Sequence, residues 1–456
     1  MIKYTPAFLK KLEDILTESA YTVRYERGNF QSGWCLLERK SVVVLNKFLD
    51  TEGRINTLAD IIPQLAVNFD KLTHESQILY EFLLQEAGAA NTGNTAETQL
   101  NLNNMSNLSV TKKDWGTIND QQVSIYELNN DTVKVFVSNY GGTIQLIEAP
   151  DKNGRIHNIV AGYHTAEEYR DDNDYYLGAL VGRYANRIAD GKFTIAGESY
   201  TLPVNNGPNS LHGGIEGFHR KIWEVTGQQE TATEASVTME YTSKDGEEGY
   251  PGNLQVQVTY ALSADNKLKI QYLATTDKAT PVSLTNHSYF NLNGFEDVVT
   301  GHELKINAES YTKKNENNVP AGELEFLDKD HPLYFGEFTK LEKNIDQFAE
   351  DRGFDHNYVL TMQPFRQLLE AAELRDPQSG RYLKVYTDQP GLQIYTANWF
   401  DGSRKGTHSK PYGKYDAIAL ETQAFPNSPN VPAFPNSILQ PGEEYNSTTV
   451  YEIGVE

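Results

Sequence analysis

The chain of 456 residues is poor in the features of secreted and membrane proteins. It has one cysteine, Cys35, so it cannot form an intrachain disulfide and it lacks the paired Cys-x-x-Cys pattern of zinc sites. No apolar run approaches membrane-spanning length, and the N-terminus lacks a basic stretch followed by an apolar one. We therefore expect a protein of the cytoplasm.

Several common catalytic motifs are also missing. There is no Gly-rich phosphate loop, no G-x-G-x-x-G, no G-x-S-x-G and no His-Glu-x-x-His. The ten histidines lack the spacing of zinc ligands. The sequence therefore predicts a site without a catalytic metal.

Positive charge is scarce, because 40 Lys and Arg face 62 Asp and Glu, for a formal net charge of −22. Residues 1–90 carry 10 basic and 12 acidic side chains, so the acidity belongs to the long C-terminal part. An acidic surface repels phosphate backbones and anionic membranes, which argues against nucleic acid or a membrane as partner and favours a neutral or cationic ligand. Solubility is the alternative explanation of the charge.

The length exceeds the usual limit of one hydrophobic core, and the residue patterns divide the chain in three. Residues 1–90 predict a small α+β domain, with an amphipathic helix at 7–19, a β-rich segment at 21–48, and helices at 57–67 and 75–86. Residues 91–109 are rich in Ala, Gly, Asn and Thr without apolar periodicity, which predicts a flexible linker. Residues 110–456 then form one large domain.

Strand patterns dominate the large domain. Apolar and polar residues alternate at 133–137, 237–241, 254–260 and 268–272, and turn signals separate such segments. One short helical pattern, at 365–373, is either a helix or a loop. Many short strands at this spacing predict a mainly β fold, a large antiparallel β-sandwich.

Two segments offer polar groups among small residues. Arg183, Asn186 and Arg187 lie within Val-Gly-Arg-Tyr-Ala-Asn-Arg-Ile and suit the binding of vicinal hydroxyls or an anion, although surface charges are the alternative. In Asn-Ser-Leu-His-Gly-Gly, the two glycines after His212 permit unusual backbone conformations and the close approach of a ligand. A structural histidine is the alternative there.

Two further segments combine polar groups with aromatics, which is a composition that suits a sugar. His287 lies in Leu-Thr-Asn-His-Ser-Tyr-Phe-Asn-Leu-Asn-Gly-Phe and has an ordinary pKa near neutrality, although a core histidine bonded to a carbonyl is the alternative. Asp355 precedes His356 in Gly-Phe-Asp-His-Asn-Tyr. Its carboxylate suits two sugar hydroxyls, and an Asx-turn is the alternative.

Strand alternation on two further segments places polar residues away from the core. In Gly-Leu-Gln-Ile-Tyr, Gln393 and Tyr395 face opposite to the leucine and isoleucine, and in Ile-Ala-Leu-Glu-Thr-Gln, Glu421 does the same. Glu421 meets either solvent or a site. The segment 425–435 has four prolines and follows closely, and we expect this rigid loop to cover a site where burial moves the pKa of Glu421 toward neutrality, as a general base requires.

Taken in order, these motifs resemble the galactose mutarotase (aldose 1-epimerase) family, and the resemblance runs from about residue 115 to 455. Residues 1–90 lie outside it. The six matching motifs are Gly-Arg-Tyr-Ala-Asn-Arg-Ile, Asn-Ser-Leu-His-Gly-Gly, Thr-Asn-His-Ser-Tyr-Phe-Asn-Leu, Gly-Phe-Asp-His-Asn, Pro-Gly-Leu-Gln-Ile-Tyr and Leu-Glu-Thr-Gln. The resemblance implies that family's β-sandwich, with its active site in an open cleft. It implies Glu421 as general base, His287 as general acid and His212 as its partner near the ring oxygen, with the sugar hydroxyls held by Asn186, Arg187, Asp355 and Gln393.

The implied reaction interconverts the α- and β-anomers of free hexoses such as glucose and galactose. The C1 hydroxyl loses a proton, the ring oxygen gains one, and the open-chain aldehyde turns and recloses. A glutamate and a histidine on opposite sides of the sugar suffice, so no cofactor or metal is expected. One alternative is an epimerase-like protein for hexose 6-phosphates, whose phosphate Arg183 and Arg187 would bind, and another is a sugar-binding protein without turnover.

Two departures from the family pattern follow the Glu-Thr-Gln motif. Ala424 and Asn427 replace bulkier or acidic residues, which predicts altered contacts at the rim of the site. Residues 1–90 have no assigned function. Tyr25, Phe30 and Trp34 either pack in the core of that domain or form a surface for a partner or a second copy. The oligomeric state stays open.

Overall fold

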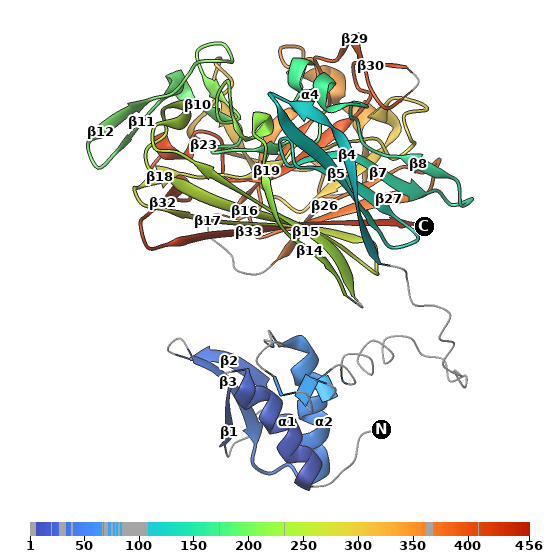
Figure 1. Ribbon diagram of the computed structural model, residues 1–456, viewed down its shortest axis with the longest axis vertical. Helices are drawn as coiled ribbons and strands as arrows, with labels where there is room; N and C mark the ends of the chain where they lie inside the picture. The colour runs from blue at the N-terminus through green and yellow to red at the C-terminus, as the bar shows by residue number, and fades with distance from the viewer. Residues whose placement is uncertain are drawn as a thin grey trace. The chain divides into compact units, whose positions relative to one another are not determined.

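A computed structural model of the chain describes residues 6–19, 21–26, 33–37, 40–65 and 108–456, apart from 173, 232, 362–367 and 409, together with eight single residues between 67 and 83. The chain divides into two compact units, Met1–Asn103 and Asn104–Glu456 (Figure 1). The expected linker at 91–109 lies outside the described residues except at its C-terminal end. No helix in the described part of the chain is long and apolar enough to cross a membrane.

The first unit packs two helices against a three-stranded sheet of order β1-β3-β2. Its elements are α1 (Pro6–Glu18), β1 (Thr22–Glu26), β2 (Gly33–Leu37), β3 (Lys40–Asn46) and α2 (Thr51–Ile61). Asp50 caps α2 by accepting a hydrogen bond from the Gly53 backbone at 2.8 Å. The helix therefore begins earlier than the expected 57–67 and ends earlier too. Within the expected helix at 75–86, the described residues are helical.

The proposed partner surface of this unit is described only in part. Tyr25 donates a hydrogen bond to Glu13 and lies 4.9 Å below the guanidinium of Arg54, packed against the unit's own core. Phe30 and the side chain of Trp34 lie outside the described residues. The contacts of Tyr25 are those of core packing.

The second unit is built from three main antiparallel sheets, named here in spatial order. The nine-stranded sheet contains β14 (Glu224–Glu230), β15 (Glu234–Ser243), β16 (Leu254–Ser263), β17 (Lys267–Thr276), β33 (Glu444–Val455), β27 (Arg381–Thr387), β26 (Leu369–Arg375), β21 (Glu303–Ile306) and β24 (Thr339–Lys340). The six-stranded sheet contains β20 (Tyr289–Phe290), β31 (Ile418–Gln423), β28 (Gly391–Tyr395), β25 (Asp355–Val359), β22 (Ser310–Lys314) and β23 (Pro320–Phe326). The five-stranded sheet contains β4 (Ser109–Ile118), β5 (Gln121–Asn129), β6 (Lys134–Ser138), β7 (Thr143–Pro150) and β8 (Ile156–Asn158).

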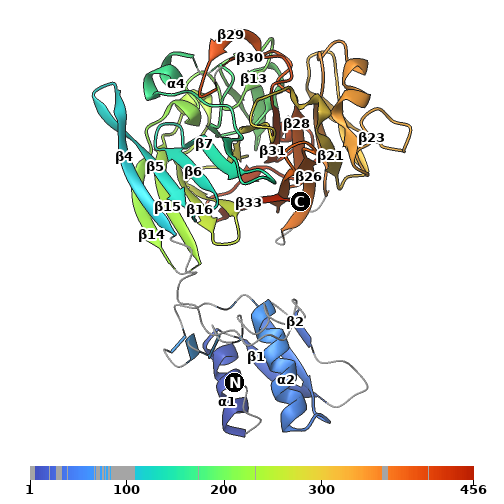
Figure 2. The ribbon, with the colours of Figure 1, turned by 90° about the vertical axis from the view of Figure 1, so that its right-hand side faces the viewer.

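Short strand pairs, short 3₁₀ helices and an α-helix also belong to the described part of this unit. The pairs are β9 (Leu180–Val181) with β19 (Thr285–Asn286), β10 (Arg187–Ile188) with β13 (Ser210–Leu211), β11 (Lys192–Ile195) with β12 (Glu198–Thr201), β18 (Thr280–Pro281) with β32 (Ile438–Leu439), and β29 (Asp401–Lys405) with β30 (Pro411–Gly413). The helix is α4 (Ala166–Asp172). In both ribbon views α4, β29 and β30 lie on the side away from β14 and β15 (Figures 1 and 2).

Alternation of apolar and polar residues explains the sandwich. Along β16 and β17 buried and more exposed residues alternate, and the buried ones join one core cluster with residues of the six-stranded and five-stranded sheets. The four predicted strand segments correspond to β6, β15, β16 and β17, with only Val133 outside its strand. The helical pattern at 365–373 is wrong where it is described, because Leu369–Arg375 is strand β26. The predicted fold class, a large antiparallel β-sandwich, is confirmed.

Arg183 differs from both sequence interpretations, because it is neither a surface charge nor a ligand contact. Its side chain is buried, and its guanidinium donates hydrogen bonds to Ser243 Oγ and to the carbonyls of Ser243, Lys244 and Pro251, each at 2.9 Å. Three backbone carbonyls thereby gain a donor that water cannot supply. Arg183 is a structural residue.

Replacing Arg183 by alanine should lower the free energy of unfolding by about 3 kcal/mol or more, because several buried carbonyls lose their donor at once. Urea denaturation followed by circular dichroism measures the effect. Lys329→Ala is the control, since that side chain is 73% exposed and should leave the midpoint unchanged. Equal midpoints for the two variants would contradict the structural role of Arg183.

Candidate active site

Glu421 lies near the middle of β31, between β28 and β20. Ile418 and Leu420 of this strand point into the main core, so alternation turns Glu421 to the opposite face, where it lines a cavity. The side chain is only 2% exposed. The alternative that Glu421 meets bulk solvent is therefore wrong.

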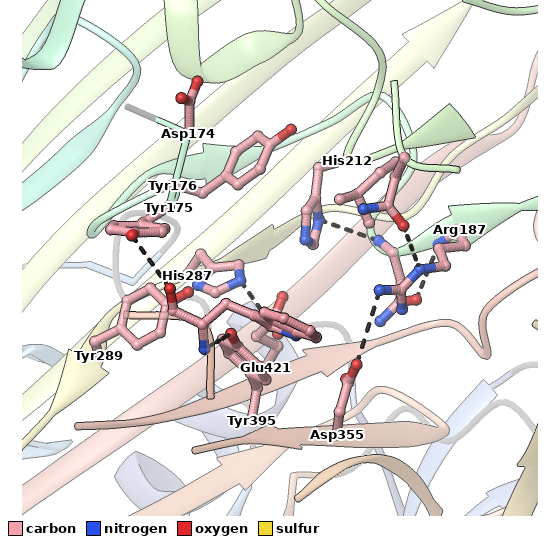
Figure 3. Close-up of a pocket in the computed structure, with 14 residues that line it drawn as sticks. Asp174, Tyr175, Tyr176, Arg187, His212, His287, Tyr289, Asp355, Tyr395 and Glu421 are labelled. Carbon is pink, nitrogen blue, oxygen red and sulfur yellow. Dashed lines mark hydrogen bonds and ion pairs between the residues drawn. The ribbon is translucent and has the colours of Figure 1, made fainter. Parts of the chain in front are cut away.

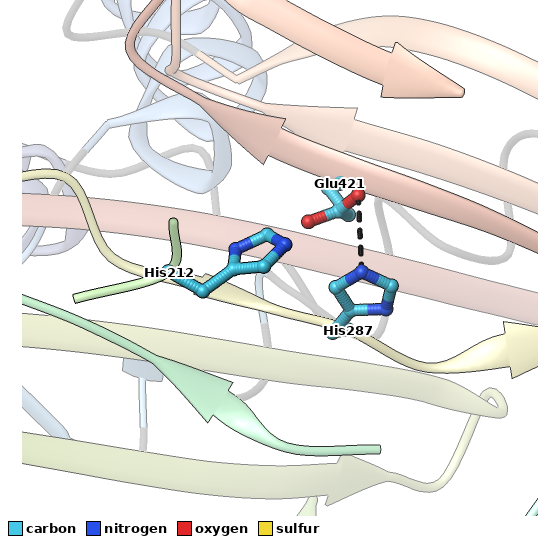
Figure 4. A group of neighbouring side chains, drawn as sticks. All are labelled: His212, His287 and Glu421. Carbon is cyan, nitrogen blue, oxygen red and sulfur yellow. Dashed lines mark ion pairs between the residues drawn. The ribbon is translucent and has the colours of Figure 1, made fainter. Parts of the chain in front are cut away.

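His287 follows β19 and faces Glu421 directly. Its Nε2 atom lies 3.5 Å from Glu421 Oε1, and both side chains are almost completely buried (Figure 4). The expectation that the two groups take opposite sides of a sugar is wrong, because no ring fits in that gap. Side-by-side placement suits the chemistry better, since the C1 hydroxyl and the ring oxygen of a pyranose are bonded to the same carbon.

His212 is held by the turn that follows β13. β13 pairs with β10, and the Asn186 and His212 backbones are joined by the hydrogen bond from His212 N to Asn186 O at 3.0 Å. The imidazole Nδ1 accepts a second hydrogen bond, from Asn186 N at 3.2 Å. Gly213 has φ +85°, and a Cβ there would lie 1.9 Å from Gly182 O, so the predicted need for glycine after the histidine is confirmed.

Arg187, Asp355 and Gln393 form a polar group on the other side of the cavity. Arg187 Nη2 lies 3.7 Å from Asp355 Oδ2, and its Nε donates to Asn206 Oδ1 at 3.0 Å. Gln393 donates from Nε2 to Asp355 Oδ1 at 2.6 Å. Gln393 does not line the cavity, and its binding of sugar hydroxyls stays a prediction.

The cavity has a volume of about 240 Å³ and gathers side chains from segments distant in sequence (Figure 3). Six of the seven predicted site residues line it, namely Glu421, His287, His212, Asn186, Arg187 and Asp355. Sequence reasoning missed Asp174, Tyr175, Tyr176 and Trp399, which also line it. An acid beside two tyrosines is the polar and aromatic composition that directed attention to His287, so the same signal was present at 174–176.

The proline-rich segment 425–435 is not a lid. None of its residues lines the cavity; Phe425, Val431 and Phe434 pack with Val359 in a separate small core. Asn427 donates from its backbone to Arg187 O at 2.8 Å, so the segment supports the Arg187 strand from behind. Ala424 and Asn427 do not line the cavity either, and the predicted change of rim contacts at these positions is wrong.

Burial reverses the usual order of the two facing pKa values. Desolvation raises the pKa of Glu421 well above 4.5, and nearby Asp355 adds to the rise. Desolvation also lowers the pKa of His287 to about 4. A proton shared by this pair therefore resides more readily on Glu421 than on His287 when no sugar is bound.

His212, His287 and Glu421 place their possible ligand atoms within 4.8 Å of one another, which is a composition found in metal sites. The hydrogen bond from Asn186 N to His212 Nδ1 opposes that use. A neutral imidazole that accepts at Nδ1 carries its proton on Nε2, and a protonated nitrogen cannot bind a metal. The tautomer instead makes His212 a hydrogen-bond donor.

The fold and this group of side chains agree with a known family. The family described as aldose 1-epimerase matches residues 124–452, and the chain belongs to it. Galactose mutarotase of Sus scrofa is 40% identical over 76% of this chain and 99% of its own length. Aldose 1-epimerase of Escherichia coli K12 is 36% identical over 72% and 94%. The solved galactose 1-epimerase of Lactobacillus acidophilus NCFM superposes with a TM-score of 0.67 at 26% identity, covering 76% of this chain and 99% of its own.

Glu421→Gln should stabilise the protein. Glu421 Oε2 has no hydrogen-bond partner among the described residues, and the raised pKa means that stability is lost as pH rises through the folded-state pKa. The variant should gain about 0.5–2 kcal/mol at pH 8 and less at pH 5, by urea denaturation.

Glu373→Gln provides the matched control for this prediction. Glu373 is also a buried strand glutamate, but it accepts a hydrogen bond from Arg375 at 2.7 Å. Its replacement should destabilise the protein by about 1 kcal/mol. A loss of stability at both positions would refute the claim that Glu421 is held at a cost.

Proposed function

We propose that this aldose 1-epimerase interconverts the α- and β-anomers of free aldohexoses such as glucose and galactose, with Glu421 as general base and His287 as general acid. The supporting observation is the buried pair, whose Oε1 and Nε2 atoms lie 3.5 Å apart at one wall of the cavity. That spacing lets one group exchange a proton with the C1 hydroxyl while the other exchanges a proton with the ring oxygen. A cytoplasmic location belongs to the same proposal.

The catalytic cycle starts when a sugar brings hydroxyl donors to Glu421. These donors favour the carboxylate, and the shared proton moves to His287. Glu421 then removes the proton of the C1 hydroxyl, the electrons of that bond form the aldehyde, the bond from C1 to the ring oxygen breaks, and His287 protonates that oxygen. After rotation about the bond from C1 to C2, the same steps run backward from the other face, and both groups recover their starting protons.

The remaining residues orient the sugar. His212 carries its proton on Nε2 and donates to the ring oxygen beside His287. Asn186, Arg187 and Asp355 line the cavity and hydrogen-bond the other hydroxyls. Gln393 keeps Asp355 in place through its 2.6 Å hydrogen bond. Tyr176 contributes an aromatic face 4.6 Å from His212, which suits the apolar side of a pyranose.

Charge in the cavity favours a free sugar over a hexose 6-phosphate. Among the lining residues Asp174, Asp355 and Glu421 carry carboxylates, whereas Arg187 alone carries a guanidinium, and that group faces Asp355. Arg183, the second arginine considered for a phosphate, is bonded elsewhere. A binding protein without turnover is disfavoured too, because binding alone gives no reason to bury an acid and a base in contact.

Wild-type protein should accelerate the change in optical rotation of freshly dissolved α-D-glucose and α-D-galactose. Glu421→Gln and His287→Asn should each lower kcat/KM by about 10²–10⁴-fold, since each removes one proton-transfer group. Glu240→Gln, an outward-facing carboxylate of β15, is the control and should keep full activity. An inactive wild type that still binds sugar would support the binding protein instead, and full activity of Glu421→Gln would overturn the choice of base.

The pH dependence of kcat/KM should show the pH below which the pair of Glu421 and His287 binds a second proton. Because burial lowers the pKa of His287 to about 4, kcat/KM should fall on the acid side near pH 4 and not near 6.5, the ordinary histidine value. Polarimetry across pH 3.5–8, with circular dichroism at each pH to verify folding, measures it. An acid limb centred near 6.5 would mean that His287 titrates as an exposed histidine.

A further inference from the structure

Two segments far apart in sequence border the cavity on the same side. The first begins at Asp172, the last residue of α4, and supplies Asp174, Tyr175 and Tyr176 to its lining. The second, residues 399–404, runs from the loop after β28 into β29 and supplies Trp399. The shape of this side of the cavity therefore depends on how the two segments are held to each other.

Arg404 holds the first segment from the second. Its guanidinium forms ion pairs with Asp172 through Nη1 and with Asp174 through Nη2, the latter at 3.1 Å. It also lies 5.1 Å from the ring centroid of Tyr175, a cation–π distance. The arginine side chain is 23% exposed, so these contacts are partly shielded from water.

Tyr175, in the first segment, contacts several residues of the second segment. Its hydroxyl donates to Trp399 O at 3.2 Å and to Asp401 Oδ1 at 3.4 Å, and its ring centroid lies 4.6 Å from that of Phe400. The two segments are thus joined by charge, hydrogen bonds and ring packing together. We call Asp172, Asp174, Tyr175 and Arg404 the clasp.

The clasp is connected to the acid and base by packed rings. Phe400 lies 4.9 Å from Tyr289, and Tyr289 lies 4.8 Å from His287, centroid to centroid. On the outer side, Trp399 is 55% exposed, and the Arg352 guanidinium lies 4.7 Å from its ring. A shift of the clasp should therefore displace the aromatic residues that border the cavity more than it displaces His287.

We propose that Arg404 is a positioning residue that sets sugar affinity by fixing the cavity's aromatic and acidic rim. The inference rests on the proposed function, because it concerns substrate binding at the same cavity. Arg404 does not line the cavity and touches neither Glu421 nor His287, so its loss should raise KM without changing kcat. The pH profile should also stay unchanged, because the proton-transfer pair is untouched.

The decisive experiment compares Arg404→Gln, Asp172→Asn and their double variant by polarimetry with galactose and glucose. Each single variant should raise KM about two- to fivefold, the size expected for a partly exposed ion pair, with kcat within experimental error of wild type. The double variant should be no worse than the worse single one, because both changes break the same contact. Arg170→Gln is the control, since Arg170 pairs with Asp171 on α4 and makes no contact with residues 399–404.

The exchange variant Arg404→Asp with Asp172→Arg provides a rescue test. It should recover part of the lost affinity if charge complementarity holds the rim, whereas a merely structural defect should not be repaired. An unchanged KM in Arg404→Gln would overturn the proposal. A fall in kcat as large as the rise in KM would overturn it too. If Arg404→Gln fails to fold, Asp172→Asn keeps the test, because Arg404 then remains over Tyr175.

Failure of the clasp and failure of the proposed function can be told apart. Wild-type turnover in the same assay tests the proposed function by itself. Titration calorimetry of galactose with wild type and Arg404→Gln measures affinity without turnover. Equal dissociation constants would overturn the clasp even if the wild type is fully active.

Discussion

The site depends on a buried glutamate, Glu421, whose carboxyl group is not fully hydrogen-bonded within the described residues. Glu421 Oε2 and His287 Nδ1 have no hydrogen-bond partner among the described residues, although buried polar groups are normally bonded. Burial without partners disfavours both charged forms, because it raises the pKa of the Glu421 carboxyl group and lowers the pKa of the His287 imidazole. In the mechanism that we propose, a sugar supplies the missing hydrogen bonds, so that binding and proton rearrangement are one event. The cost in stability would then prepare the pair for catalysis.

Such a pair persists only where its surroundings cannot relax to satisfy it. β31 is held from behind by the nine-stranded sheet, since Tyr451 of β33 donates to Leu420 O at 3.2 Å and the hydroxyls of Thr422 and Thr449 are hydrogen-bonded to each other. The register of β28 against β31 places Gln393 beside Glu421. The sandwich thus acts as a rigid support, and Arg187 of β10 and His212, in the turn after β13, line the same cavity as the pair.

Sequence alternation predicted a good part of this arrangement. Period-two patterns identified the strands and the face on which Glu421 lies, because a strand's two faces are fixed by local geometry. The same patterns could not tell what lies opposite that face. Whether Glu421 meets solvent, a lid or a histidine is decided by contacts between β31 and β19, and those depend on the packing of the whole unit. The motif order supplied that information only as resemblance.

The wrong expectations share one cause. The composition of a charged or proline-rich segment does not show which residues it contacts in the fold. Arg183 and Arg187 lie four residues apart, yet one donates to buried loop carbonyls and the other faces Asp355 in the cavity. The proline-rich segment is bonded to the Arg187 strand and does not line the cavity. Composition therefore indicates the kind of site, and tertiary contacts decide which of the candidate residues belong to it.

The charge on Asp355 affects both the charge on Glu421 and the kind of ligand that the cavity favours. Burial acts to raise the pKa of Asp355, but Lys314 and Arg187 outweigh it and lower the pKa below 3.8, so Asp355 stays ionised. An ionised Asp355 then disfavours a second negative charge on Glu421, whereas Arg187 acts on Glu421 in the opposite sense. A neutral sugar that hydrogen-bonds both carboxylates reduces this repulsion, because its hydroxyls donate to each. An anionic substrate would increase it, which agrees with our proposal of a free sugar as the substrate.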